Sequence, residues 1–307
     1  IDKGRISYML DVVIIGSGPA GITAAIYAKR ANLNVAVVEK EYLGTGQIAE
    51  SSRVDNYPGI PGIDGYSLGE KFREHAESLG VEFTEAQVLS LGQKDGIWII
   101  VCDEDITLES KAVIYATGCK NRPLGVPGEE KYYGRGLSFC AVCDGAFYKG
   151  KRVAVIGGGD TALDDAMYLS DICEKVYLVH RREFFRGSAS ILEKLKQKEN
   201  VEIIVNARVE EITGDKKIDG IILDNKTKLN ISGLFAAVGM IPQTELLKEF
   251  GVLDESNYVK ASEDTKTTVN GLFAAGDVRT KQLRQVVTAA ADGANAIYSV
   301  MEYLRNI

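Results

Sequence analysis

Two cysteines and an aspartate stand close together in one short stretch of this 307-residue sequence and are the residues best suited to covalent chemistry. The stretch reads SFCAVCDG from Ser138 to Gly145, so two residues separate Cys140 from Cys143, and Asp144 follows directly. Such a pair can close and open a small disulfide ring, with the thiolate as the reactive form. Asp144 is placed to move the proton that thiol–disulfide exchange requires. The stretch therefore predicts a redox centre.

A glycine-rich turn, GSGPAG, lies upstream of the cysteine pair and begins at Gly16. Gly16 permits a tight turn, Gly18 lets a pyrophosphate approach the backbone, and Gly21 allows a helix to pack closely on a strand. The surrounding pattern predicts a strand over 11–15, a helix over 22–30 and a second strand over 35–38. That strand ends at Glu39, whose carboxylate can accept hydrogen bonds from ribose hydroxyls. We therefore predict a dinucleotide site here.

A second glycine turn, GGGDTA at 157–162, follows the cysteine pair and repeats this pattern. In both copies, 23 positions separate the first glycine from the residue that ends the second strand. In the second copy that residue is His180, which we interpret as structural, and Arg181, Arg182 and Arg186 come after it. Arginines suit a 2′-phosphate because they form paired, charge-assisted hydrogen bonds. The second site is therefore predicted to prefer NADP to NAD.

The rest of the chain fits around these two turns. We expect a loop over 44–59, a helix over 66–79 and a strand over 111–118, and later a strand over 231–238 and a helix over 288–304. Two small antiparallel units are predicted, from strands 81–91 and 98–102 and from strands 201–209 and 218–223. The predicted fold class is α/β, with two Rossmann-like three-layer dinucleotide-binding domains, the second inserted in the first.

Composition narrows the class of protein. The apolar fraction of 45% is ordinary for a globular chain, and the net charge of -7 argues against a nucleic-acid binder. No apolar run is long enough to span a membrane, and the short, mixed stretch 1–10 predicts no secretory signal. An odd number of cysteines, five, favours a reducing compartment and a cytoplasmic location. Cys102, Cys119 and Cys173 are predicted to be buried free thiols.

Taken together, the sequence resembles the low-molecular-weight thioredoxin reductases of the FAD-dependent pyridine nucleotide–disulfide oxidoreductase superfamily. The most specific marks are CAVCDG at 140–145, HRR followed by Arg186, and FAAGD at 273–277 followed by Arg284 and Gln285. In the glutathione reductase branch the redox cysteines fall in the first nucleotide domain, and a histidine in a C-terminal domain is catalytic. Here the cysteines lie in the second domain and no histidine follows His180, so Asp144 is the acid–base candidate.

The resemblance implies the cofactors and the residues that bind them. FAD would occupy the first domain, 1–118 and 246–307, and NADPH the second, 119–245. The implied FAD residues are Gly16, Gly18, Gly21, Glu39, Lys40, Gly46, Gln47, Asn56, Asp277, Arg284, Gln285 and Val286. The implied NADPH residues are Gly157, Gly159, Asp160, Thr161, Ala162, His180, Arg181, Arg182 and Arg186.

The resemblance also implies a route for electrons, from NADPH to FAD, to the cysteine pair and then to thioredoxin. Cys143 would face the flavin and Cys140 would attack the substrate disulfide, with Asp144 moving the proton. Because nicotinamide and disulfide cannot occupy the flavin face together, the second domain must rotate, with hinges near 118–122 and 242–245. A homodimer through the FAD domains is also implied.

Three alternatives stay open at this point. The same fold could serve a peroxide-reducing partner or take electrons from ferredoxin, although the arginines favour NADPH. Cys140 and Cys143 could bind a metal in a non-enzymatic module, although zinc normally takes four ligands and no second Cys or His pair is spaced for it. Last, the cysteines could be purely structural in an FAD and NADPH oxidoreductase.

Overall fold

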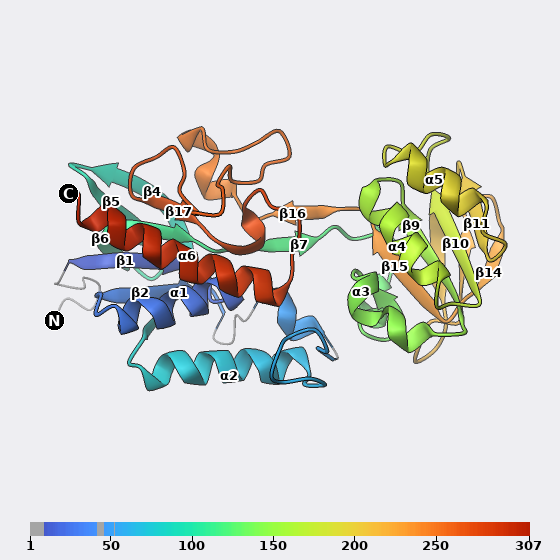
Figure 1. Cartoon of the computed structure of the whole chain (residues 1–307), viewed down its shortest axis with the longest axis horizontal. Helices are drawn as coiled ribbons and strands as arrows, with labels where there is room; N and C mark the ends of the chain where they lie inside the picture. Colours follow the sequence, from blue (N-terminus) through green and yellow to red (C-terminus); the bar gives the residue numbers. More distant parts are fainter. Residues whose placement is uncertain (1–8, 42–45, 52) are drawn as a thin grey trace. The chain divides into compact units, whose positions relative to one another are not determined.

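The computed structural model describes residues 9–41, 46–51 and 53–307. The prediction for the first eight residues, and part of the predicted 44–59 loop, lie outside these ranges. The chain divides into two compact units. The first unit comprises Ile1–Ser51, Tyr57–Lys120 and Ile241–Ile307, and the second comprises Ser52–Asn56 and Asn121–Met240. The second unit is thus an insertion in the first, and the colours of Figure 1 follow this order.

The first unit is built on a seven-stranded sheet in the order β3-β2-β1-β6-β5-β4, with β17 paired to β6. Strands β1, β2, β3, β6 and β17 run parallel, whereas β5 is antiparallel to both of its neighbours, β4 and β6. The strands are β1 (Leu10–Ile15), β2 (Val35–Glu39), β3 (Glu82–Glu85), β4 (Val88–Lys94), β5 (Ile97–Cys102), β6 (Thr107–Tyr115) and β17 (Leu272–Ala274). The helices are α1 (Pro19–Arg30), α2 (Gly65–Ser78) and α6 (Val286–Leu304), with short 3-10 turns η1 (Gly46–Glu50), η4 (Glu245–Phe250) and η5 (Gly276–Val278).

Side chains of the parallel strands point alternately to the two faces of the sheet, and each face is covered by its own hydrophobic core. Val12 and Ile14 of β1 pack against α1 and α6, and Figure 1 shows these helices on one side of the sheet. Val13 and Ile15 point the other way and pack with Trp98 of β5 and with the segment that contains η4. Successive side chains of a strand face opposite sides of a sheet, so both faces of β1 are buried.

The second unit has a five-stranded parallel sheet in the order β11-β10-β9-β15-β8 and a three-stranded antiparallel sheet, β12-β13-β14. Its strands are β8 (Leu137–Ser138), β9 (Arg152–Gly157), β10 (Lys175–His180), β11 (Val201–Val205), β12 (Val209–Thr213), β13 (Gly220–Leu223), β14 (Lys228–Asn230) and β15 (Gly233–Ala237). Its helices and 3-10 turns are α3 (Ala141–Asp144), α4 (Asp160–Ser170), α5 (Ala189–Lys196), η2 (Glu129–Tyr132) and η3 (Gly145–Tyr148). One face of the parallel sheet packs on α3, α4 and α5, and the other on the antiparallel sheet, which gives three layers.

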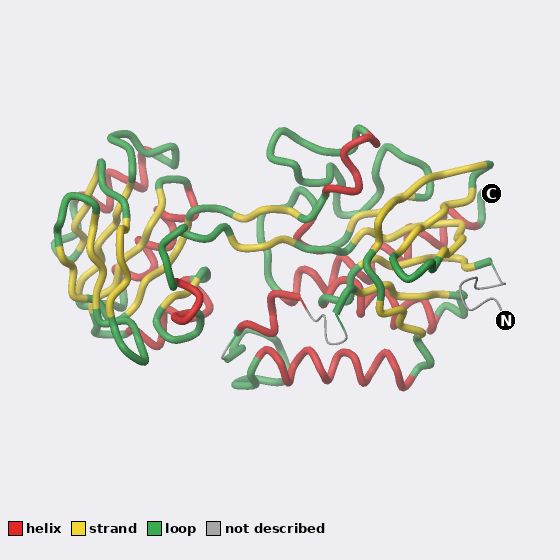
Figure 2. Tube along the Cα trace, turned by 180° about the vertical axis from the view of Figure 1, so that it is seen from behind, coloured by secondary structure: helices red, strands yellow, loops and turns green. Residues whose placement is uncertain are grey.

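Two short strands carry the chain from one unit to the other. They are β7 (Cys119–Asn121) and β16 (Met240–Pro242), which pair with each other and run side by side in Figures 1 and 2. Hydrogen bonds close the ladder at both ends, from Gln243 N to Gly118 O at 3.0 Å and from Arg122 N to Gly239 O at 3.0 Å. The two connections that enter and leave the 121–240 segment are therefore adjacent.

The predicted fold class is confirmed, but several strand predictions are wrong. Residues 81–91 form two strands, β3 and β4, and β4 and β5 continue the main sheet instead of packing beside it. This is because β6 is long enough to pair with β1 through Ser110–Tyr115 and with β5 through Thr107–Ser110. Likewise 201–209 is not one strand, since β11 joins the parallel sheet through β10. The predicted 44–59 loop contains the turn η1.

None of the helices within the described ranges is both long enough and apolar enough to cross a membrane.

The three cysteines predicted to be free, Cys102, Cys119 and Cys173, are free and buried, as expected for packing residues.

Candidate active site

The cysteine pair lies at the start of a one-turn helix in the second unit. Cys140 and Cys143 are joined by a disulfide, and their Cα atoms are 5.3 Å apart. Cys140 is the N-cap residue of α3, and its sulfur accepts a hydrogen bond from Cys143 N at 3.2 Å. Ala141 is fully buried against the α4 layer, whereas Val142 is 62% exposed. The helix is thus anchored through Ala141, while Val142, the other residue between the two cysteines, faces solvent.

Asp144 sits beside the disulfide and is hydrogen bonded to Ser138. Ser138 Oγ donates to Asp144 Oδ2 at 2.6 Å, and Asp144 N donates to Cys140 O at 3.1 Å. Burial raises the pKa of the Asp144 carboxyl, and the bond from Ser138 offsets part of that rise. A carboxyl with a raised pKa next to a disulfide is suited to deliver a proton to a departing thiolate. Sequence reasoning had given Ser138 no role, because only the fold brings it to Asp144.

The second glycine turn is crowded by its neighbours. A Cβ on Gly157 would lie 2.4 Å from Ala237 O, and one on Gly158 would lie 2.2 Å from the His180 ring. At Gly159, the N-cap of α4, a Cβ would meet no atom within 4 Å. No side chain of the described chain caps this helix, and Ala162 N donates to Gly159 O at 3.1 Å, so the Asp160 and Thr161 amides are the first-turn donors left for a phosphate.

The predicted arginines flank this turn. Arg186 N donates to Gly158 O at 2.7 Å, and Ser188 N donates to Asp160 Oδ1 at 2.7 Å, so the 186–188 segment is fixed against the turn. Arg181, Arg182 and Arg186 are exposed, and none of the ion pairs found in the described ranges involves them. Three such guanidinium groups form a cationic surface at the end of β10. Thr161 and Ala162 follow in the first turn of α4, Ala162 fully buried.

His180 lies beneath the glycine turn. Its ring packs against Phe185, with ring centroids 4.8 Å apart, and Nε2 is 3.2 Å from Phe184 O. Burial lowers the pKa of His180, and the charges of the three arginines act in the same direction. The structure therefore places His180 as a support for the turn.

The first glycine turn is held by the acid that ends β2. Glu39 Oε2 accepts from Ser17 N at 2.8 Å and from Ser17 Oγ at 2.9 Å, and Glu39 Oε1 accepts from Lys40 N at 2.7 Å. Gly18 is the N-cap of α1 and lacks a side-chain cap among the described residues. Gly46 lies nearby, since its Cβ would be 3.6 Å from Gly18 Cα. A cavity of about 110 Å³ opens at Glu39, lined also by Glu41, Arg73, Phe83, Thr84 and Glu85.

A second part of the first unit gathers around Asp277 of η5. Asp277 Oδ1 is buried without a hydrogen-bond partner in the described chain, and burial raises the pKa of this carboxyl to about 6. Its backbone carbonyl accepts from Cys119 Sγ at 2.9 Å and from Arg284 Nε at 3.3 Å. Arg284 also stacks on the ring of Tyr258, 4.2 Å from its centroid. Gln285 is the N-cap of α6 and closes a capping box with Thr288, and Val286 begins the helix.

A buried ion network supports the η5 turn. Asp292 of α6 accepts from Gly276 N at 2.9 Å, from Arg279 Nε at 2.8 Å and from Lys281 Nζ at 2.8 Å. The side chains of Asp292 and Arg279 are each only 3% exposed. Sequence reasoning missed these three residues, since only the fold brings Arg279 and Lys281 to one carboxylate.

One residue predicted to bind FAD lies in a segment of the second unit. Asn56 belongs to the 52–56 segment of the second unit, whereas the other residues predicted to bind FAD belong to the first.

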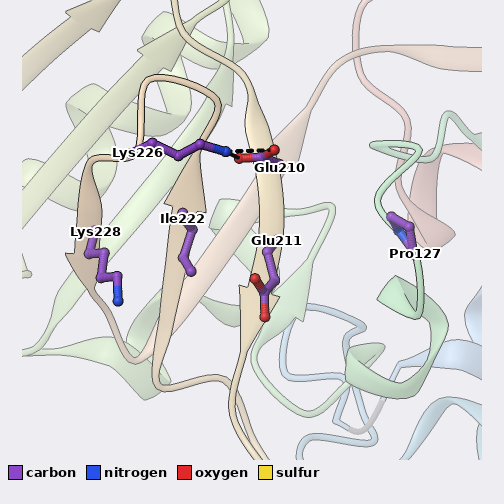
Figure 3. A pocket seen from close by; sticks show the side chains of 6 residues that line it. All are labelled: Pro127, Glu210, Glu211, Ile222, Lys226 and Lys228. Carbon is purple, nitrogen blue, oxygen red and sulfur yellow. Dashed lines mark hydrogen bonds and ion pairs between the residues drawn. The ribbon is translucent and has the colours of Figure 1, made fainter.

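A larger cavity of about 400 Å³ lies elsewhere in the second unit, between Pro127 and the antiparallel sheet (Figure 3). Glu210 and Lys226 are joined there by hydrogen bonds of 2.6 and 2.9 Å, and none of the predicted site residues lines it.

The arrangement of two glycine turns and a redox-type disulfide defines a class of protein. The sequence pattern of the family described as "Pyridine nucleotide-disulphide oxidoreductase" matches residues 10–293, and the chain belongs to this family. It is 38% identical over 308 residues to a thioredoxin reductase of Mycoplasma genitalium, covering 98% of this chain and 97% of that protein.

Solved structures agree with this assignment. The thioredoxin reductase of Streptococcus pyogenes superposes with a TM-score of 0.91 at 40% identity, covering 97% of this chain and 99% of that one. The thioredoxin reductase of Giardia duodenalis gives a TM-score of 0.89 at 38% identity, with coverage of 97% and 100%. A protein of Clostridium pasteurianum described only as a "34.2 kDa protein in rubredoxin operon" is 39% identical over 303 residues, covering 96% of this chain and 97% of that one.

Proposed function

We propose that this chain is an NADPH-dependent thioredoxin reductase that binds FAD in its first unit and NADPH in its second. The observation that carries the proposal is the Cys140–Cys143 disulfide, which lies beside a carboxyl with a raised pKa. Because the two sulfurs are bonded to each other, they are not free thiolate ligands for a metal. The relatives named thioredoxin reductase support the choice of substrate.

The residues of the first unit fit FAD. The glycine turn offers uncapped amides to a pyrophosphate, and Asp277 Oδ1 is a buried acceptor that lacks a donor in the described chain. Polar groups buried without a partner are rare, and a hydroxyl of the flavin's ribityl chain would satisfy this one. When bound, FAD supplies hydride chemistry, and the chain's own residues bind and orient it.

The residues of the second unit fit NADPH. The amides of α4 would hold the pyrophosphate, and the exposed guanidinium groups of Arg181, Arg182 and Arg186 would hold the 2′-phosphate. Glu39, at the matching position of the first unit, would repel that phosphate. We therefore assign the 2′-phosphate to the second site, which favours NADPH over NADH and over ferredoxin as the electron donor.

The sulfur chemistry divides between the two cysteines. In the dithiol form, Cys140 would attack the substrate disulfide, and Cys143 would then attack Cys140 to regenerate the internal bond and release the reduced substrate. Asp144 would give its proton to the departing substrate thiolate. The exposed side chain of Val142 leaves the pair open to a partner protein.

Because the cysteines and the NADPH residues share one unit while the FAD residues lie in the other, we propose that the second unit rotates between half-reactions. Gln243 is fixed to the first unit, since Tyr115 Oη and Thr117 Oγ1 both donate to its carbonyl at 2.8 Å. The hinge would therefore lie in β7 and β16 and not extend to residue 245. A cross-link between the units is expected to leave one half-reaction intact and to abolish turnover. Full turnover in the cross-linked protein would exclude the rotation.

The test is a steady-state assay of the FAD-loaded protein with a matrix of donors and acceptors. The donors are NADPH, NADH and reduced ferredoxin, and the acceptors are thioredoxin and a peroxide-reducing disulfide protein. We expect NADPH with thioredoxin to give the highest kcat/KM. Reduction of the peroxide-reducing partner alone, or activity with ferredoxin alone, would contradict the proposal. The homodimer and the cytoplasmic location are part of the proposal, and the mass of the protein by light scattering tests the former.

A further inference from the structure

Ser138 connects the two chemical parts of the redox centre. Its Oγ accepts a hydrogen bond from Cys140 N at 3.1 Å and donates to Asp144 Oδ2 at 2.6 Å. Among the described residues, no other side chain donates a hydrogen bond to the Asp144 carboxylate. One hydroxyl therefore ties the backbone of the first cysteine to the carboxyl that follows the second.

The position of Ser138 is fixed by the sheet. It is the last residue of β8, where it pairs with Phe235 of β15, and only 6% of its surface is exposed. A serine held in a strand and excluded from water presents its hydroxyl in a constant direction, unlike one on a mobile loop.

The hydroxyl has one hydrogen and two acceptors within reach. Asp144 Oδ2 is 2.6 Å away and Cys140 O is 3.4 Å away, and a single hydrogen serves only one of them well. An ionised Asp144 takes that hydrogen. A protonated Asp144 can donate from Oδ2 back to Oγ while the hydroxyl hydrogen turns to Cys140 O.

We propose that Ser138 is the positioning residue for Asp144 and that its hydroxyl serves this carboxyl in both protonation states. The inference rests on the proposed function only in taking Asp144 as the proton donor. Burial favours the protonated carboxyl and the Ser138 bond favours the ionised one, so the two effects together set where Asp144 titrates.

The step that Ser138 would assist is the proton transfer of thiol–disulfide exchange. The Cys140 thiolate attacks one substrate sulfur, the substrate S–S bond breaks, and a Cys140–substrate disulfide forms. The other substrate sulfur leaves with the electron pair and takes the proton of Asp144. Cys143 then gives its proton to the Asp144 carboxylate and attacks Cys140, and the second substrate sulfur leaves with the electron pair of the mixed disulfide. The substrate thus gains two electrons, and the dithiol is oxidised to the internal disulfide.

The elements packed against α3, which are η3 and α4, carry titratable side chains. Tyr148 of η3 is near enough for the charge of Asp144 to raise its pKa, although burial is the larger cause. On α4 the ring of Tyr168 lies against Gly145, and the pKa of Asp165 is raised by burial and by Asp164 to about 7. Variants at Ser138 leave all of these groups in place.

The experiment compares Ser138→Ala with Ser170→Ala. Ser170 is a matched control, because it is also 6% exposed, lies in the same unit and donates a 2.6 Å bond, to Met167 O. The readout is an isotope-edited infrared titration of the aspartate carboxyls in the reduced FAD-loaded protein, with Asp144→Asn identifying the band. The pH profile of single-turnover reduction of thioredoxin is measured in parallel.

Ser138→Ala is expected to shift the midpoint of the Asp144 band upward by about one pH unit, the effect of losing one hydrogen bond to a charged group. Ser170→Ala is expected to leave it unchanged. An unshifted band in Ser138→Ala overturns the proposal. If that variant does not fold, Ser138→Thr and Ser138→Val decide the question, because they share a shape and differ in the hydroxyl, and equal midpoints would overturn it. Failure of the protein to reduce thioredoxin would refute the proposed function, while the infrared titration would still decide the role of Ser138.

Discussion

The two glycine turns share one backbone plan, yet different physics supports each of them. In both, the residue 23 positions after the first glycine holds the turn in place. At the first turn, Glu39 does so through hydrogen bonds to Ser17. At the second, His180 does so by placing its ring under Gly158. A repeat in sequence therefore preserves a structural position while the chemistry at that position changes.

The difference also sets the charge that each site offers. The carboxylate of Glu39 is used inside its own turn and makes the first site anionic, whereas the end of β10 carries three exposed arginines. We therefore propose that the same geometry discriminates between two dinucleotides through the residues at the end of the second strand. The predictions below test this division of labour between the two units.

The largest effect is expected at the cysteine pair, which only the second unit carries. Cys143→Ser is expected to reduce NADPH-driven thioredoxin reduction on the order of a thousandfold or more, because the internal disulfide cannot form. Cys173→Ser, which replaces another buried cysteine of this unit, is expected to retain activity. Activity near the wild-type level in Cys143→Ser would show that the pair is structural.

Two buried acids of the first unit are expected to respond in opposite ways. Asp292→Asn leaves Arg279 and Lys281 without their carboxylate and is expected to lower the free energy of unfolding by about 3–5 kcal/mol. Burial alone would raise the pKa of Asp292, but the bonds from Arg279 and Lys281 lower it overall. Its contribution is therefore present at neutral pH and is lost as pH falls through the folded-state pKa.

Ionisation of Asp277 has the opposite effect on stability, since the pKa of its carboxyl is raised to about 6. Ionisation then costs stability as pH rises from the unfolded value toward 6, and the cost persists at pH 7. Asp277→Asn is expected to stabilise the flavin-free protein at pH 7 by roughly 2–3 kcal/mol and to weaken FAD binding. Urea unfolding and FAD titration measure both, and destabilisation of flavin-free Asp277→Asn would contradict the assignment of an unpartnered carboxylate.

Replacing Arg181, Arg182 and Arg186 together with serine tests the charge difference between the two sites. We expect the KM for NADPH to rise roughly tenfold to a hundredfold, because charge-assisted hydrogen bonds to the 2′-phosphate are lost, while the use of NADH is unchanged. Arg152→Ser is the control, since Arg152 is also exposed but begins β9 at the opposite end of the strand. An equal loss with both dinucleotides would argue against 2′-phosphate recognition.

The smallest effect concerns the second turn itself. Gly158→Ala is expected to destabilise the protein by about 1–3 kcal/mol, because the added methyl group meets the His180 ring. Gly159→Ala is expected to leave the free energy of unfolding nearly unchanged, since no atom lies within 4 Å and its φ of -97° suits alanine. Thermal unfolding of the two variants measures the difference, and equal melting temperatures would be the contrary outcome.

Sequence reasoning predicted best the features that depend on local spacing. The two strand–turn–helix repeats, the cysteine pair and the buried free thiols are each encoded within a few dozen residues. The sequence did not predict that β4 and β5 join the main sheet, because this depends on β6 pairing with β1 along one part of its length and with β5 along another. Strand 201–209 was likewise divided by a long-range pairing with β10.

The supporting residues of the site were harder to predict. Ser138 stands six positions before Asp144, and only the return of the chain from β8 into α3 brings the two together. Asp292 meets Arg279 across the join between η5 and α6, which no local pattern reveals. Such contacts depend on tertiary packing, so the residues proposed to touch cofactor or substrate are easier to predict from a sequence than the residues that hold them in place.

The most direct test measures whether NADPH reduces the Cys140–Cys143 disulfide. The FAD-loaded protein is titrated with NADPH without oxygen, oxidised thioredoxin is added, and thiols are alkylated and mapped by mass spectrometry before and after the addition. Cys140 and Cys143 are predicted to become labelled after NADPH and to return to the disulfide as two thioredoxin thiols appear. A Cys140–Cys143 disulfide that persists under excess NADPH would contradict the proposed function.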